Sequence, residues 1–120
     1  MNAIVHGRPP NAVGLISAGV KIPVMTSEHA VMIRRMEVVD YAASGEDCAR
    51  AIATQLKKRN VVEIRSHRFF SMGRNLHEAT SRLDALEETA KIHLAGRFVG
   101  GTPGLGENEV KKTGEAYSRE

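Results

Sequence analysis

The sequence predicts an α/β domain whose helices pack in layers around one sheet. Three observations favour this class. Short runs of strand-forming residues alternate with helix-like runs along the chain. Two of these short strands flank a bend near His67, where residues 61–64 and 69–73 are rich in β-formers. A long amphipathic helix is predicted to follow directly, so that the two strands have a face to pack against.

Composition restricts the class of protein further. The chain has 120 residues, enough for one domain with a single core, and a formal net charge of +3. Only 4% of the residues are aromatic and none is Trp, which leaves few platforms for stacking nucleic-acid bases. The one cysteine excludes an intrachain disulfide. No apolar run approaches the ~20 residues of a membrane span, so a cytoplasmic protein is expected.

Residues 3–41 contain four predicted helices and strands and one extended segment. Pro9 ends an opening strand, Gly19 ends a short buried helix, and Thr26 or Ser27 caps a second helix. In order, the expected elements are a strand at 3–8, a helix at 11–19, an extended segment at 21–24, a helix reaching residue 33, and a strand at 36–41.

A third helix is predicted from a variant capping box that starts at Ser44. Cys48, Ile52 and Leu56 follow at a spacing of four, which puts the cysteine on the buried face in a structural role. The basic run at 57–60 is interpreted as cations at the negative end of this helix rather than as a nucleic-acid patch.

The long helix is the most strongly patterned element. Asn75 is a plausible N-cap and Gly96 a plausible stop. One apolar stripe is predicted along it, formed by Leu76, Ala79, Leu83, Leu86 and Ala90. We expect a folded domain over residues 1–99, followed over 100–120 by a glycine-rich connector and a flexible tail with at best a weak helix at 107–117.

Histidines are the candidate functional residues. His6 and His67 each end a β-run, where side chains from separate strands can converge, and neutral imidazoles are usual zinc ligands. His77 and His93 on the long helix are interpreted as packing or surface residues. His29, inside a short helix, has no evident partner in the sequence.

Three stretches together resemble the class II aldolase and adducin family, which includes fuculose-phosphate aldolase. Residues 3–10 (AIVHGRPP) are similar to its His-x-His-Pro strand, and residues 64–68 (IRSHR) to its Arg-Asn-His-Gly bend. Residues 73–91 are similar to its long helix. The resemblance implies a three-layer α/β/α-like fold with a mostly antiparallel sheet, matched only in its later part and therefore truncated at the N-terminus.

In that family three histidines bind a divalent metal that stabilises an enediolate, and the resemblance places His6 and His67 at two of the three positions. Arg8 occupies the third, and arginine is cationic and has no lone pair to donate. Arg68 stands where glycine is usual. A divalent metal, most readily zinc, is therefore expected to bind weakly at this degenerate, lyase-like site.

The family's acid/base glutamate and phosphate-binding loops lie before the His-x-His strand, so no catalytic residue is carried over to this chain. Family enzymes are typically cyclic tetramers, which implies a homo-oligomer or a related subunit as partner. We therefore expect a family member related to metal-dependent sugar-phosphate aldolases and epimerases that is impaired when alone. An active aldolase, completed by another subunit or an upstream segment, is the alternative.

The arginines near the bend have several interpretations. Arg8, Arg68 and Arg65 are candidates for an anion pocket that takes a phosphorylated or carboxylated small molecule. Equally, they face solvent or pair with Glu63 or Asp40. A third interpretation is nucleic-acid binding by basic residues together with Phe69 and Phe70, although these aromatics are better explained as core.

Overall fold

The computed structural model describes residues 3–34, 36–39, 45–65, 68–101 and 104–118. Within these ranges the strands and helices alternate as the sequence predicts. The elements in chain order are β1 (Ala3–Gly7), α1 (Pro10–Ser17), α2 (Ser27–Met32), β2 (Glu37–Val39), α3 (Gly45–Leu56), β3 (Val61–Ile64), β4 (Arg68–Gly73), α4 (Leu76–Arg97) and α5 (Glu107–Ser118).

The described strands form one four-stranded sheet in the order β1-β4-β3-β2. β4 pairs antiparallel with both β1 and β3, whereas β2 pairs parallel with β3. The mostly antiparallel sheet is therefore confirmed. In the β1–β4 ladder His6 lies opposite Phe70, so the two side chains share one face of the sheet.

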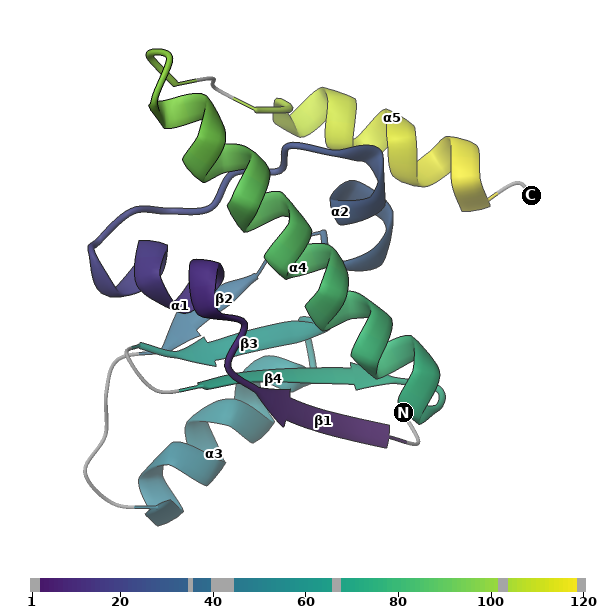
Figure 1. Ribbon diagram of the computed structural model, residues 1–120. Coiled ribbons are helices and arrows are strands. Elements are labelled where there is room, and N and C mark those ends of the chain that lie inside the picture. Colours follow the sequence, from purple (N-terminus) through teal and green to yellow (C-terminus); the bar gives the residue numbers. More distant parts are fainter. Residues whose placement is uncertain (1–2, 35, 40–44, 66–67, 102–103, 119–120) are drawn as a thin grey trace.

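Helices cover both faces of this sheet (Figure 1). On one face, Ile52 and Leu56 of α3 pack with Val62 and Ile64 of β3. On the other face, α1 and α4 enclose a larger core. Its buried residues are Ala12, Leu15, Ile16, Ile33, Val61, Phe69, Leu83, Leu86 and Ala90. The expected three-layer arrangement is confirmed.

The long helix α4 follows its predicted pattern with two corrections. The Asn75 side chain accepts a hydrogen bond from the Glu78 backbone N–H at 2.8 Å, which confirms the N-cap. Leu76, predicted on the buried stripe, is instead 65% exposed, at the first position of the helix. The helix also passes Gly96 and ends at Arg97.

The junction between β4 and α4 requires glycine. A Cβ on Gly73 would lie 2.7 Å from the backbone nitrogen of Ala79, closer than real side chains come. The chain can therefore turn directly from the strand into the helix only if this position has no side chain.

Other elements differ from their predicted bounds by a few residues. α1 begins at Pro10, because proline has no N–H to lose at the first helical position. Thr26 caps α2 by accepting from the His29 N–H at 3.1 Å. β2 is limited to residues 37–39, while residues 40–41 and Ser44 lie outside the described part. Cys48 is half-buried against the α3 side of the sheet.

The C-terminal helix α5 lies beside α2 (Figure 1). The connector before it contacts the segment that leads into α2, because the Leu105 N–H donates to the Val24 carbonyl. Whether residues 100–120 form a separate flexible tail stays a prediction. Among the described residues, no helix is long and apolar enough to cross a membrane.

Candidate functional site

His6 is held near the open edge of the sheet. It lies on β1, and its imidazole stacks on the Phe70 ring with a centroid distance of 5.5 Å and an angle of 9° between the rings. Phe70 in turn packs against the core beneath α3. This stacking fixes the plane of an otherwise exposed imidazole, so its nitrogens have a defined direction.

Arg68, the first residue of β4, contacts His6. Its Nη1 lies 3.2 Å from the His6 Nδ1. Because a guanidinium only donates, the Nδ1 accepts this hydrogen bond, and the imidazole is then neutral with its proton on Nε2. The Arg68 Nε is buried and has no hydrogen-bond partner among the described residues. Donor capacity toward a ligand therefore rests on the Nη N–H groups of Arg68 that do not face His6.

Arg8 extends this basic cluster along the chain. It is exposed in the loop between β1 and α1, two residues after His6. Its positive charge is therefore carried just past the end of the strand that holds His6. His67 lies outside the described residues, so the predicted convergence of His6 and His67 stays a prediction.

The described donors do not fit a divalent metal. In the described ranges no three His, Cys, Asp or Glu side chains group as a metal ion requires. The His6 Nδ1 already accepts from a cationic guanidinium, and Arg8 cannot donate a lone pair. The two positive charges favour an anion at this edge of the sheet over a cation.

Arg65 lies apart from this pair. It follows β3, and its backbone N–H donates to the Val39 carbonyl at 2.9 Å. Its side chain lines a cleft on the face covered by α1, together with Ile16 and Val20. The structure thus brings His6 and Arg68 together on the α3 side and places Arg65 on the opposite side of the sheet.

Glu63 is a buried carboxyl that sequence reasoning treated only as a partner for arginine. It is fully buried, and neither carboxyl oxygen has a hydrogen-bond partner in the described part of the chain. Pairing of Glu63 with the candidate arginines is therefore wrong for the described residues, and Asp40 lies outside them. Burial raises the pKa of Glu63 to about 8. Its place between Val62 and Ile64 in a short β-rich run was the signal available in the sequence.

His29 has a partner that the sequence did not reveal. Its Nδ1 lies 3.2 Å from the Thr89 Oγ1 in the buried contact between α2 and α4. Burial lowers the pKa of His29 to about 4, so the ring is neutral near pH 7. His93 is buried, as its place near the apolar stripe predicts, whereas His77 is exposed.

Comparison with known proteins identifies the family. The model of the class II aldolase and adducin N-terminal domain matches residues 1–94. The L-fuculose phosphate aldolase of Methanocaldococcus jannaschii is 26% identical over 99 residues, which are 82% of this chain and 54% of that protein.

Solved structures agree on the fold. An L-fuculose 1-phosphate aldolase has a TM-score of 0.83 and 21% identity, covering 96% of this chain and 55% of that one. The L-fuculose-1-phosphate aldolase of Thermus thermophilus has a TM-score of 0.71 and 27% identity, and the match covers 85% of this chain and 57% of that one. YgbL of Klebsiella pneumoniae, a putative aldolase/epimerase/decarboxylase, has a TM-score of 0.75 and 25% identity, covering 92% and 56%.

These matches extend along nearly the whole chain, although it spans only about half the length of the relatives. They include the strand that carries His6 and the β3–β4 hairpin that carries Arg68. The resemblance expected from the sequence is confirmed: the chain belongs to the class II aldolase and adducin family.

Proposed function

We propose that this chain is a class II aldolase-type domain that binds a small phosphorylated or carboxylated molecule through Arg68 and Arg8 and does not cleave sugar phosphates by itself. The relatives named above supply the substrate class, phosphorylated sugars. The basic side chains beside His6 supply the chemistry that recognises its anionic group.

One observation carries the proposal: a guanidinium donates to the imidazole that would otherwise serve as a metal ligand. Arg68 thereby gains a fixed direction, and a guanidinium has further Nη N–H donors, beyond the one directed at His6, that an oxyanion can use. Arg8 adds a second positive charge two residues after His6. A phosphate at this edge would accept charge-assisted hydrogen bonds, which are about twice as strong as neutral ones.

A divalent metal, if it were bound here, would polarise the carbonyl group of a substrate. While the His6 Nδ1 accepts from Arg68, Nε2 carries the ring proton, so neither nitrogen offers a free lone pair to such an ion, and the neighbouring guanidinium charge repels it. We therefore propose that zinc binds weakly to this chain. Cleavage also needs an acid/base, and we propose none among the residues at this site.

Phosphate binding tests the proposal directly. Phosphate titration should shift the NMR signals of the Arg68 Nε–H and the His6 ring, and Arg68→Gln should weaken binding about tenfold. Arg8→Gln should weaken it by a smaller factor, because this side chain is exposed. Arg50→Gln is the matched control, since Arg50 is exposed on α3 and pairs with Glu46.

Two results would contradict the proposal. One is equal weakening by Arg50→Gln and Arg68→Gln, which would mean a general charge effect. The other is cleavage of fuculose 1-phosphate that a chelator blocks. That result would favour the alternative, an active metal-dependent aldolase whose remaining groups come from another subunit or segment.

We also propose that the chain associates with a second copy or a related subunit through β1. In the described part of the sheet β1 pairs only with β4, and Ile4 on it is 49% exposed. An unpaired edge with an apolar side chain recruits another strand. Light scattering at micromolar concentration should show an oligomer that Ile4→Lys dissociates, and a monomer with a cooperative melt would refute the idea.

A further inference from the structure

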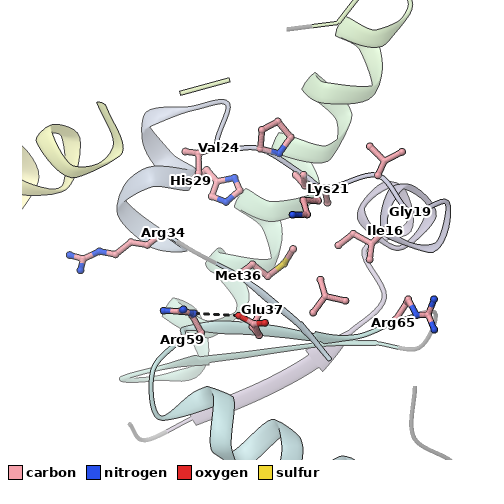
Figure 2. Close-up of a pocket in the computed structure, with 14 residues that line it drawn as sticks. Ile16, Gly19, Lys21, Val24, His29, Arg34, Met36, Glu37, Arg59 and Arg65 are labelled. Carbon is pink, nitrogen blue, oxygen red and sulfur yellow. Dashed lines mark ion pairs between the residues drawn. The ribbon is translucent and has the colours of Figure 1, made fainter. Parts of the chain in front are cut away.

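The cleft that Arg65 lines lies on the face of the sheet opposite the His6–Arg68 pair. It opens between the end of α1, the segment at 19–24, α2 and the edge strand β2, and has a volume of about 620 Å³ (Figure 2). Clefts of ~300–1,000 Å³ are typical of small-molecule sites. The volume of this cleft therefore suits a small-molecule ligand.

Apolar and basic side chains line this cleft. The apolar wall includes Ile16, Val20, Ile22, Val24, Met36 and Val38. The cations are Lys21, Arg34, Arg59 and Arg65. Among the described residues of the lining, Glu37 is the single carboxylate, and it lies 3.9 Å from Arg59 (Figure 2). Over the described part of the lining, four cations therefore stand against one carboxylate, so positive charge is in excess.

Arg34 has a backbone conformation that arginine disfavours. Its φ is 61°, and in the described part of the chain it is the one residue other than glycine with a positive φ. It follows the C-terminus of α2, where its N–H donates to the His29 carbonyl at 2.9 Å. Glycine is the usual residue at such a position. An arginine retained in a strained position beside a cleft points to a use for its side chain.

The apolar wall is held in place by the C-terminal connector. The Leu105 N–H donates to the Val24 carbonyl. Gly104, with φ 75°, approaches so closely that a Cβ there would lie 2.7 Å from the same oxygen. The segment at 20–24 is thus fixed from outside, and a ligand would meet a preformed wall.

We propose that this cleft binds a small organic anion with an apolar body, such as an aryl or alkyl carboxylate, sulfonate or phosphate. The body contacts Ile16, Val20 and Val38, while Lys21 and Arg34 in the lining supply positive charge that attracts the anionic group. Glu37 pairs with Arg59, so its negative charge is partly offset within the lining (Figure 2). The proposal is independent of the anion site beside His6, which lies on the other face of the sheet.

Two dyes of similar shape test it. Anilinonaphthalene sulfonate carries an apolar body and an anion, and N-phenylnaphthylamine is its neutral counterpart. The sulfonate should bind the native protein at one saturable site, more tightly than the neutral dye. Lys21→Met and Arg34→Gly should each weaken sulfonate binding about threefold, and together about tenfold, without changing binding of the neutral dye.

Arg34→Gly separates binding from folding. Because glycine adopts a positive φ without strain, this variant should raise the melting temperature by about 4 °C. At the same time it should weaken binding of the sulfonate dye. Lys57→Met is the matched control, since Lys57 is exposed beyond the end of α3 on the other side of the sheet. It should change neither quantity.

Three results would overturn the proposal. Equal affinity for the two dyes would mean a purely apolar site. Equal weakening by Lys57→Met and Lys21→Met would mean a general charge effect. A dye signal that grows in mild urea before the cooperative melt would come from an exposed core rather than from the cleft.

Discussion

Glu87 on α4 holds the N-terminus of α1 through Asn11. Its Oε2 accepts from the Asn11 backbone N–H at 3.1 Å and from the Asn11 Nδ2 at 3.2 Å, and its Oε1 accepts from the Ala12 N–H at 3.0 Å. Pro9, the N-cap residue of α1, makes no side-chain cap. A carboxylate from another helix thus replaces the missing local cap and complements the positive end of α1.

Removing this carboxylate should destabilise the fold. Glu87→Ala leaves three donors at the start of α1 without their acceptor, and hydrogen bonds to charged groups contribute roughly 1.5–3 kcal/mol. We expect a loss of about 2 kcal/mol in the free energy of unfolding, measured by urea denaturation. Glu88→Ala is the control, because Glu88 is the exposed neighbour on α4. Equal losses in the two variants would contradict the interhelical cap.

His29 should make stability depend on pH in the acidic range. Its pKa is lowered from 6.5 to about 4 in the fold, so the unfolded chain binds an extra proton between these values. The stability that neutral His29 confers is fully present above pH 6.5 and is lost as the pH falls toward 4. The gap in unfolding free energy between wild type and His29→Gln should shrink by about 2–3 kcal/mol from pH 7 to pH 4.5.

His77→Gln is the control for this titration, because His77 is exposed on the same long helix that carries Thr89. As a substitution at an exposed position, it should change the unfolding free energy at pH 7 by no more than about 0.5 kcal/mol. A His29→Gln gap that is constant with pH would mean that His29 titrates alike in the folded and unfolded chains.

Glu63 should make stability change with pH in the direction opposite to that of His29. Its pKa is raised from 4.5 to about 8 in the fold, so the folded chain holds an extra proton between these values and stability falls as the pH rises through them. Glu63→Gln should therefore stabilise the protein at pH 7, by on the order of 2–3 kcal/mol, and change it little at pH 4. Chemical denaturation at the two pH values measures this.

His29 and Glu63 together predict how the stability of the wild-type protein depends on pH. Between pH 4.5 and 6.5 the gain from His29 offsets the loss from Glu63, whereas above pH 6.5 only the loss remains. We expect the melting temperature to fall from pH 6.5 to pH 8. A rise over that interval would contradict the buried, protonated Glu63.

Zinc binding should respond to Arg8. If His6 and His67 converge as the resemblance implies, Arg8→His removes a positive charge and supplies a third nitrogen. Each change is expected to contribute more than ~1.4 kcal/mol, so zinc should bind at least about two orders of magnitude more tightly. Arg8→Ala should recover only the electrostatic part. Calorimetry that finds Arg8→His no better than Arg8→Ala would show that these positions do not form a site.

Local patterns in the sequence were sufficient for the helices and strands themselves. The stripe from Ala79 to Ala90 and the Asn75 cap define α4, since both depend on residues three or four apart. The short β-rich runs define β3 and β4, because β-propensity is likewise carried by residues that are close in sequence. Motif spacing was also sufficient for the family, because the family's segments keep their order along the chain.

The contacts that govern the sites depended on tertiary structure. Arg68 and His6 are 62 residues apart, His29 and Thr89 are 60 apart, and Glu87 and Ala12 are 75 apart. No periodicity of 2 or 3.6 residues reports such pairs. The burial of Glu63 likewise arises only once helices cover both faces of the sheet. Burial and partner choice belong to the packed layers, since each depends on which distant surface comes to lie against a side chain.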